Sequence, residues 1–286
     1  MNEITYIAWK LPEEFTELFL VPMSDLHKGN PFFSEKHLNR TTEYIASKPN
    51  VRYVLNGDML EAATKTSKSN VFAQTEAPGK QAAWVKKHFA PISKQCLGLT
   101  SGNHENAIYD TVGVDLCGEI ADALDRPYRP EGMLLKISFG GGNERHATAP
   151  YVFWTYMTHG WGGARTPGAK AKKVEDQSHY VTADLHIMSH DHVVNVAPTV
   201  ELQADRRTYP VYDEYEDEKE WQSGTVRAKR VMLVKSNAYL KWGGYAQRLG
   251  FPPSDLTSPL IVFLTPKSPM WSMFPERPKQ AIKVIV

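Results

Sequence analysis

Five apolar runs along the chain have the length and composition of buried β-strands. They lie at residues 18–21, 51–55, 95–99, 151–157 and 183–188. Continuous apolar runs of this length are typical of strands that are covered on both faces. Helical patterns separate them: a helix that Ser34 caps and that runs through Ile45, then helices at residues 81–89 and 114–124. Strand, helix and strand in succession predict a parallel sheet.

The remaining segments predict a second sheet. Residues 133–139 alternate in the manner of a strand, and β patterns return at 193–202, 231–235 and 260–264. An edge strand is expected within residues 1–15, a surface loop able to cover a site at 62–80, and a solvated acidic run at 213–220. We therefore expect an α/β fold with a single domain over residues 1–286, in which residues 200–286 complete the second sheet and form a C-terminal extension.

Composition and charge exclude some classes of protein. The formal net charge is only +1, so the chain as a whole does not attract polyanions, although a local basic patch remains open. The N-terminus lacks a signal-peptide pattern, and no apolar run approaches the roughly 20 residues needed to span a bilayer. Cys96 and Cys117 fall in a predicted strand and helix, which suits buried free thiols in a reducing compartment. The cytoplasm is the expected location, or the host cytoplasm if the chain is phage-encoded.

Ligand-competent side chains follow the predicted strands. They are Asp25, His27, Asp58, Asn103, His104, His159, His190 and His192. Five of the ten histidines occupy such positions, and the other five have no comparable setting. Taken singly, each residue could be a helix cap or part of a turn. Because the carboxyl ends of parallel strands meet at one sheet edge, the whole set predicts a site with donors enough for two metal ions and one shared carboxylate.

The same residues form blocks that resemble a known family. In chain order, Asp25-x-His27, Gly57-Asp58, Gly102-Asn103-His104-Glu105, His159-Gly160 and His190-x-His192 resemble the five signature blocks of the calcineurin-like metallophosphoesterases. The resemblance covers about residues 18–195, and the glycine-rich stretch at 162–170 is similar to phage-type and bacterial members. It implies a four-layer αββα sandwich, two mixed sheets flanked by helices, with the metal ions at one sheet edge.

The resemblance also implies roles for single residues. The implied metal ligands are Asp25, His27 and His192 for one ion, Asn103, His159 and His190 for the other, and Asp58 as the bridge. His104 would face the substrate and either stabilise the transition state or protonate the leaving oxygen, so His104 and Asp58 are the expected catalytic residues. Two positions depart from the family pattern. Ser189 replaces a usual glycine, and Glu105 replaces a frequent aspartate, which is expected to leave the metals untouched.

This donor set predicts hydrolysis of a phosphate ester. Two divalent ions about 3.5–4 Å apart can hold a hydroxide and the phosphoryl oxygens together. Manganese is the expected metal, and iron, zinc, nickel and cobalt suit the same donors. We expect a phosphodiester substrate, a nucleic acid or a nucleotide, because His190 and His192 serve both metals as in nuclease-like branches. The Gly-Asp-x-x-Asp-Arg-Gly block of protein phosphatases is also missing after Asp58.

Other interpretations stay open at this point. The chain could be a phosphomonoesterase acting on a nucleotide, sugar phosphate or phosphoprotein, or a metal-binding protein without activity. In the loop at residues 160–173, Arg165 and Lys170 either grip a substrate phosphate or belong to a tight turn with solvated charges. The aromatic group around Tyr239 and Trp242, with Tyr245 and Arg248, either stacks a nucleobase or packs in the core, and core packing is favoured. The sequence does not define the oligomeric state.

Overall fold

Two mixed β-sheets form the centre of the protein. The computed structural model describes residues 5–65, 70–142, 149–164, 166–248, 250, 253, 255–273 and 281–286. One sheet has six strands in the order β1 (Ile7–Lys10), β5 (Met133–Phe139), β6 (Tyr151–Thr158), β7 (Leu185–Met188), β9 (Glu218–Lys235) and β8 (Asn195–Tyr212). The other has five strands in the order β11 (Ala281–Ile285), β10 (Leu260–Leu264), β2 (Glu17–Met23), β3 (Val51–Asn56) and β4 (Cys96–Thr100).

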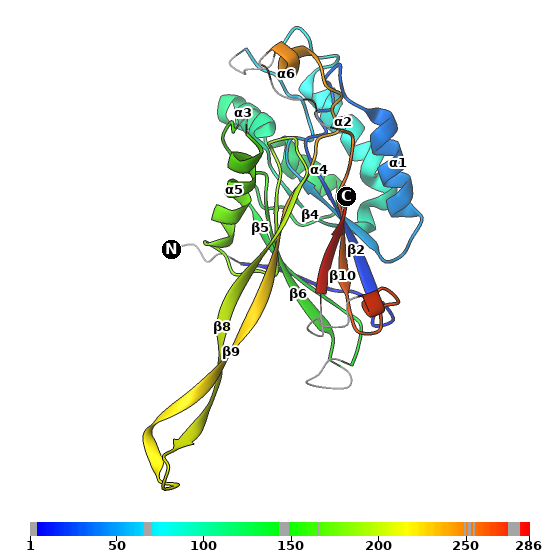
Figure 1. Ribbon diagram of the computed structural model, residues 1–286. Coiled ribbons are helices and arrows are strands. Elements are labelled where there is room, and N and C mark those ends of the chain that lie inside the picture. The colour runs from blue at the N-terminus through cyan, green and yellow to red at the C-terminus, as the bar shows by residue number, and fades with distance from the viewer. Residues whose placement is uncertain are drawn as a thin grey trace.

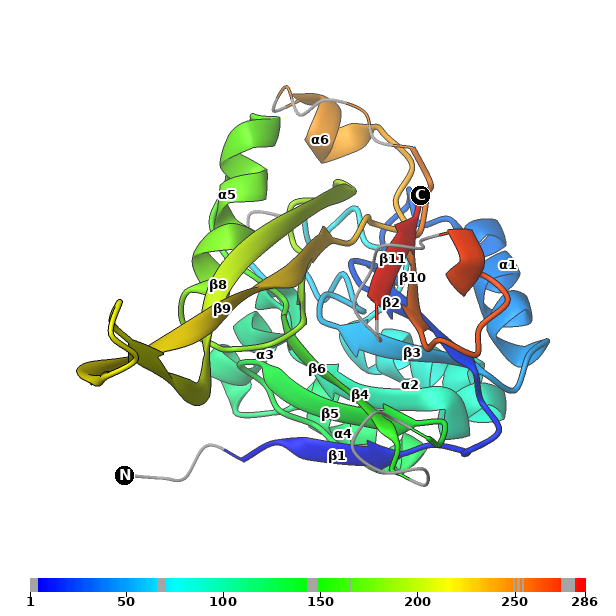
Figure 2. The same cartoon turned by 60° about the horizontal axis from the view of Figure 1, so that its bottom comes forward.

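Helices cover the outer faces of the two sheets. The described α-helices are α1 (Glu35–Ala46), α2 (Pro78–Phe89), α3 (Asn103–Val112), α4 (Leu116–Leu124), α5 (Pro167–Ser178) and the short α6 (Gly244–Arg248), with 3-10 turns at Ala90–Gln95 and Trp271–Met273. Figure 1 shows α1 and α2 on one side of the molecule and α5 on the other, and Figure 2 shows the same layers from below. The order of layers is therefore helix, sheet, sheet, helix, and the predicted fold class is confirmed.

The strand sequences explain this layering. Along β2, Leu18 and Leu20 belong to the cluster packed between the two sheets, whereas Phe19 and Val21 belong to the cluster packed under α1, α2 and α4. Alternate residues of a strand point to opposite faces, so a strand buried on both sides must be apolar throughout. The smaller cluster of Val174 with strand residues of β7 and β9 packs α5 against the outer face of the six-stranded sheet.

The direction of the strands places several polar loops at one edge. β2, β3 and β4 run parallel to one another in the five-stranded sheet. In the six-stranded sheet β6, β7 and β9 are also parallel neighbours. The residues that follow these strands therefore leave the sheets at a common end, which is the arrangement required for a site built from strand ends.

Several predicted elements are confirmed and others are longer than expected. Most helices and strands through residue 188 lie within a few residues of their predicted bounds, but the sequence did not predict α3. The predicted loop at residues 160–173 ends earlier than expected, because Thr166 caps α5 and Pro167 begins it. Cys96 and Cys117 are buried and free, as expected. The β pattern predicted at 193–202 continues to Tyr212, and that at 231–235 begins already at Glu218. None of the helices in the described parts of the chain is both long and apolar enough to cross a membrane.

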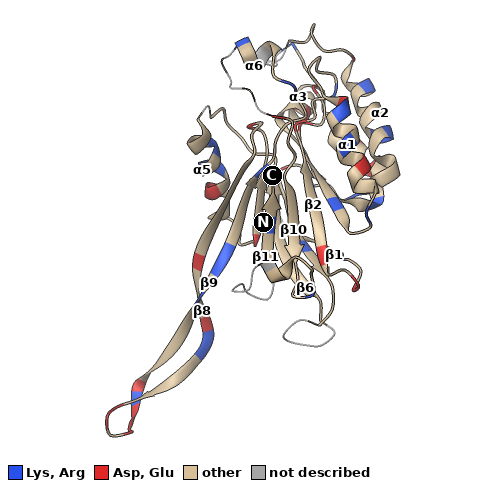
Figure 3. Ribbon diagram, turned by 45° about the vertical axis from the view of Figure 1, so that its right-hand side comes forward, with Lys and Arg blue, Asp and Glu red and all other residues tan. Residues whose placement is uncertain are grey.

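The extra length of β8 and β9 forms an arm that projects from the body (Figure 1). Each strand has 18 residues, which corresponds to about 60 Å at about 3.3 Å per residue. Acidic residues gather at the tip of the arm, within the run predicted to be solvated, and basic residues lie along its shaft (Figure 3). Apolar side chains such as Val200, Leu202 and Val226 are exposed on it. The arm is therefore not part of the packed core.

Candidate metal centre

The predicted donors converge at the common end of the two sheets. Asp25 and His27 follow β2, Asp58 follows β3, His159 follows β6, and the segment from His190 to His192 follows β7. Asp25, His27, Asp58 and His159 are all at least 96% buried. Ionisable side chains are rarely buried this deeply unless they are paired or bind a cation.

The backbone at these positions is strained. Eight non-glycine residues of the described chain have a positive φ angle, and five of them are predicted ligands: Asp25, His27, Asp58, His190 and His192, with φ between 49° and 70°. This region is unfavourable for side chains with a Cβ, and such strain clusters at functional sites. Such backbone strain at five predicted ligands supports a functional role for these loops.

A first cluster of donor atoms joins Asp25, His27 and His192. Nε2 of His192 lies 3.1 Å from Oδ1 of Asp25 and 3.2 Å from Nε2 of His27. Oδ1 of Asp25 is buried and accepts no hydrogen bond from any described residue. A buried carboxylate oxygen without a donor is costly, and a cation among these atoms would satisfy it.

A second cluster joins Asp58, His159 and His190. Oδ2 of Asp58 lies 3.1 Å from Nε2 of His159, and that nitrogen lies 3.3 Å from Nδ1 of His190. The same Asp58 oxygen lies 3.9 Å from Nε2 of His27, which belongs to the first cluster. Asp58 therefore lies between the two groups, as a bridging carboxylate would.

The spacing of these atoms fits metal coordination. Two donors that are each about 2.1 Å from one ion are about 3.0–3.4 Å apart at octahedral or tetrahedral angles. The four closest donor pairs of the two clusters fall at 3.1–3.3 Å. Both clusters, and a third made of His27, Asp58 and His104, have donor atoms close enough to hold an ion. Imidazole nitrogen and carboxylate oxygen are ligands that first-row divalent metals accept.

Neighbouring carbonyls fix the orientation of two histidines. Nδ1 of His159 lies 2.8 Å from the carbonyl oxygen of Asn56, and Nε2 of His190 contacts the carbonyl oxygen of Gly162. A carbonyl only accepts, so these nitrogens carry the protons and donate. The other nitrogen of each ring then turns a lone pair toward the cluster, as in many metal sites where an outer hydrogen bond sets the tautomer.

Two glutamates support the centre, and the sequence interpretation gave neither this role. Oε2 of Glu61 lies 3.2 Å from Nδ1 of His27 and accepts from Asn30 at 3.0 Å. Glu105 is 2% exposed, and its carboxylate accepts from the backbone N–H groups of Asp58, Leu60 and Gly102 at 2.8–3.1 Å. Glu105 thus holds the Asp58 loop against the start of α3. The acid three residues into the helix was the available signal, since a residue there often reaches back to the preceding backbone N–H.

His104 lies beside the donors without replacing any predicted ligand. Its ring packs edge-on against His27 at 4.5 Å between centroids, its Nδ1 contacts the carbonyl of Glu61, and its backbone N–H donates to Oδ1 of Asp58 at 3.0 Å. Burial disfavours the charged ring, but Asp58 and the Glu61 carbonyl outweigh burial and raise the pKa of His104 above its usual value. The doubly protonated ring is therefore more favourable here than in a free imidazole.

The carboxylates of both clusters stay ionised. Burial would raise the pKa of Asp25 and of Asp58, but the adjacent imidazoles of His192 and His159 dominate and hold both pKa values below the usual range. For His159, burial lowers the pKa, and the charge of Asp58 outweighs it and raises the pKa to about 10. Without a metal, a second proton on His159 thus balances the charge of Asp58, whereas burial lowers the pKa of His27 and of His190.

The remaining predicted residues lie in different settings. Asn103 is the first residue of α3 and is exposed, so its role as a ligand stays a prediction. Arg165 lies outside the described residues. Lys170 is 6% exposed, and its ammonium donates to the carbonyl oxygen of Asp191 at 2.9 Å. This contact supports the turn between His190 and His192, whereas the predicted contact with substrate phosphate stays a prediction.

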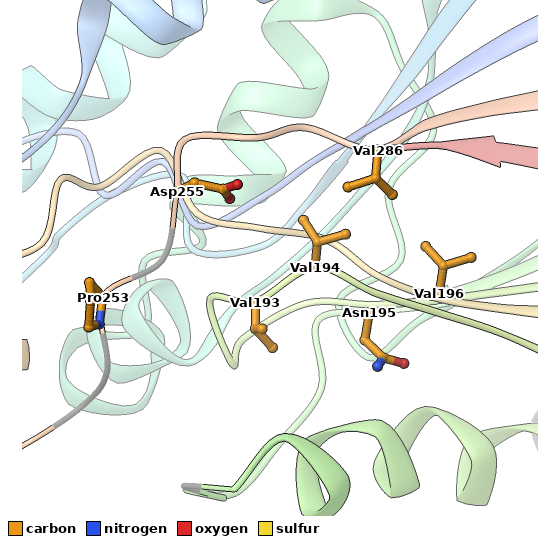
Figure 4. A pocket seen from close by; sticks show the side chains of 7 residues that line it. All are labelled: Val193, Val194, Asn195, Val196, Pro253, Asp255 and Val286. Atoms are coloured by element: carbon orange, nitrogen blue, oxygen red, sulfur yellow. The ribbon is translucent and has the colours of Figure 1, made fainter.

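The aromatic group after β9 is divided between core and surface. Tyr239 is 1% exposed and packs in the core under α1, whereas Trp242 is 44% exposed. The Tyr245 side chain lies outside the described residues. A separate pocket of about 410 Å³ begins one residue after His192 and is lined by Val193, Val194, Asn195, Val196, Pro253, Asp255 and Val286 (Figure 4). Four valines and a proline line it together with the polar side chains of Asn195 and Asp255, and none of these described lining residues is a lysine or arginine that would bind a phosphate.

The similarity found for this chain is to solved structures rather than to a sequence family. No family model and no curated protein matches the chain. Among solved structures, the chain is similar to a conserved uncharacterized protein from Streptococcus pneumoniae TIGR4 that is described as a predicted phosphoesterase. The two share 10% sequence identity with a TM-score of 0.34, and the match covers 87% of this chain and 84% of that one.

Proposed function

We propose that the protein is a dinuclear metal-dependent phosphoesterase of the calcineurin-like type, which hydrolyses a phosphodiester in a nucleic acid or nucleotide. One observation supports this most strongly: two clusters, each of two buried donors and one half-buried histidine, meet at a single carboxylate, Asp58. A bridging carboxylate between two divalent ions is typical of enzymes that transfer phosphoryl groups to water.

The residues present fit two such ions. Asp25, His27 and His192 would hold one, and His159 and His190 would hold the other together with Asn103, while Asp58 would be shared between them. The orphaned Oδ1 of Asp25 and the inward lone pairs of the histidines would each gain a partner. Bound divalent ions would supply a nucleophile from water at neutral pH and neutralise charge on the phosphoryl oxygens, with manganese as the expected metal.

The chain's own residues then position and protonate the substrate. His104 stands next to the clusters, and its raised pKa lets it hold a proton for the leaving oxygen. Glu105 fixes the Asp58 loop, so the bridging carboxylate does not have to reorganise during the reaction.

The segment after Asp58 supports a phosphodiester over a phosphoprotein substrate. Met59, Leu60 and Ala62 are fully buried, and Glu61 turns its carboxylate to His27. The segment therefore presents no arginine to the phosphate, in contrast to the Asp-Arg-Gly block that protein phosphatases carry at this position.

A comparison of chromogenic esters tests the proposal. Metal-free protein is reconstituted with Mn²⁺ and assayed on bis(p-nitrophenyl) phosphate and p-nitrophenyl phosphate. Asp58→Asn should abolish turnover, while Asp110→Asn, an exposed aspartate on α3, should not change it. A preference for the monoester of more than about tenfold would favour a phosphomonoesterase. Inactivity with Mn²⁺, Ni²⁺, Co²⁺, Zn²⁺ and Fe²⁺ would favour a metal-binding protein without catalysis.

A further inference from the structure

The side chains proposed to bind the metals come from two sheets, and no described strand of one sheet is paired with a strand of the other. Asp25, His27 and Asp58 follow strands of the five-stranded sheet, and His159, His190 and His192 follow strands of the six-stranded sheet. Each cluster contains donors from both sheets. The apolar packing between the sheets is not directional, so it does not by itself fix their offset to the fraction of an ångström that coordination requires.

A chain of buried polar side chains crosses between the sheets directly beneath the donors. Oγ of Ser24 lies 2.7 Å from Oγ of Ser236, which lies 2.8 Å from Oγ of Ser189. Ser189 in turn accepts a hydrogen bond of 2.6 Å from Nδ2 of Asn56. All four residues are 0% exposed. Hydrogen bonds in such a dry setting are directional and strong, because no water competes for them.

Three of the four hydrogen-bonded residues stand next to a donor loop, and Ser236, which directly follows β9, joins two of them. Ser24 directly precedes Asp25, and Ser189 directly precedes His190. Asn56 stands two residues before Asp58, and its backbone carbonyl accepts the proton of His159. Two further bonds occupy its side chain: Nδ2 donates to the Thr158 carbonyl at 2.6 Å, and Oδ1 accepts from Thr100 at 2.8 Å. The amide is thus bonded to the ends of β4, β6 and the Ser189 turn together.

We propose that Asn56, Ser189, Ser236 and Ser24 form an inter-sheet latch that sets the separation of the two donor clusters. They are positioning residues, because they act through the loops that they hold and do not reach the metals themselves. The proposal rests on the proposed function, since it assigns the latch to the same dinuclear centre. It also gives a physical reason for a hydroxyl at Ser189, where glycine would leave Asn56 and Ser236 without their shared partner.

A double-mutant cycle on metal binding tests the latch. Metal-free Ser189→Ala, Ser236→Ala and the double variant are titrated with Mn²⁺ by calorimetry, and electron paramagnetic resonance reports the coupling of paired Mn²⁺ ions. Each single variant should lose about 10–100-fold in affinity, the range found when outer partners of metal ligands are removed. The double variant should lose less than the sum of the two single losses, because both changes break the shared Ser189–Ser236 bond. Additive losses, or affinities equal to wild type, would overturn the proposal.

A matched control separates the latch from general packing. Ser138 on β5 is also buried, and its Oγ donates to the Trp9 carbonyl at 2.9 Å at the other end of the six-stranded sheet. Ser138→Ala should bind Mn²⁺ as wild type does. If Ser189→Ala does not fold, Ser24→Ala and Ser236→Ala provide the same cycle through the Ser24–Ser236 bond.

A second readout does not need the metal. In metal-free protein, the imidazole ¹⁵N shifts of His159 and His190 should move in Ser189→Ala and stay constant in Ser138→Ala. If wild type binds Mn²⁺ but hydrolyses no ester, the proposed function fails. The double-mutant cycle on Mn²⁺ affinity then still tests whether the latch positions the donors. If wild type binds no Mn²⁺, the proposed function fails, and unchanged imidazole shifts in Ser189→Ala would overturn the latch as well.

Discussion

Nε2 of His159 lies 3.1 Å from Oδ2 of Asp58, and the opposite nitrogen of the same ring already donates its proton to a backbone carbonyl. A neutral ring would therefore turn a lone pair toward the carboxylate oxygen, and the two would repel. Either a second proton or a cation must lie between them. In the metal-free protein the proton takes this place, which is why the pKa of His159 rises to about 10.

Metal binding should therefore release a proton, and affinity should rise with pH. Below about pH 10 the His159 ring is doubly protonated, and an ion must displace the Nε2 proton to bind. From pH 7 to 9 the Mn²⁺ association constant should rise by up to about tenfold per pH unit for one released proton. Calorimetric titration in two buffers of different ionisation enthalpy measures the released protons directly.

The stability of the metal-free protein should show the opposite trend. A pKa that is raised in the folded state stabilises the fold fully below the ordinary value of 6.5, and this contribution disappears as the pH rises toward 10. The thermal midpoint without metal should thus fall across this interval, whereas His159→Gln should flatten the fall. A pH-independent Mn²⁺ affinity together with a flat midpoint would contradict the assigned proton.

Gly102 should tolerate no side chain. A Cβ at this position would lie 2.1 Å from Oδ1 and 2.2 Å from the backbone nitrogen of Asp58, and the backbone cannot move aside. Gly102→Ala should displace the bridging carboxylate and lower Mn²⁺ affinity by at least about tenfold. Gly79→Ala is the control, because nothing lies within 4 Å of its Cβ and helix α2 should accept alanine. Equal affinity in both variants would refute this account of the loop.

His104 should affect turnover more than metal binding. In the proposed function its ring donates a proton to the leaving oxygen, whereas the predicted ligand sets are complete without it. His104→Gln should lower kcat by about 10²–10⁴-fold while both Mn²⁺ affinities stay within about threefold of wild type. His179→Gln at the exposed end of α5 serves as control. A lost metal ion in His104→Gln would instead make His104 a ligand, as its distance to His27 and Asp58 permits.

Glu105 should contribute to stability as well as to the centre. In Glu105→Gln one carboxylate oxygen becomes an NH₂ group that faces a backbone N–H, so a buried donor loses its acceptor. The free energy of unfolding should fall by about 1–3 kcal/mol, and Mn²⁺ affinity should fall with it. Denaturant unfolding measures the first quantity. The exposed Glu131→Gln should change neither, and an unaltered Glu105→Gln would show that these three bonds are dispensable.

The arm should be removable without loss of the metal centre. Residues 204–226 can be replaced by an Asn-Gly turn between Gln203 and Arg227, which face each other across β8 and β9. Because the arm lies outside the core clusters, the thermal midpoint and the Mn²⁺ affinity should change little. Retained turnover on a small chromogenic ester would place the arm outside the chemistry. Loss of metal binding would show that it supports the site after all.

The hydrophobic pattern predicted the elements, and the family resemblance supplied their layers. Apolar runs such as those of β2 and β3 are typical of strands covered on both faces, and their alternation with helical patterns predicted a parallel sheet, whereas the order of two sheets between outer helices was what the resemblance implied. The polar residues after these strands could also be predicted as neighbours, because parallel strands end at one edge. The proximity of Asp25, Asp58 and His159 could therefore be predicted from their positions directly after apolar runs.

The sequence by itself determined which side chains could bind metal and that they leave the sheets at the same end. Only the tertiary structure decided how they are held: the positive φ angles, the three bonds to Glu105, the burial of Lys170 and the chain from Ser24 to Asn56. These features join residues up to about two hundred positions apart and depend on how two separate sheets are offset. Local patterns carry no information on that offset, because apolar packing sets which faces meet but not the polar contacts formed at their edge.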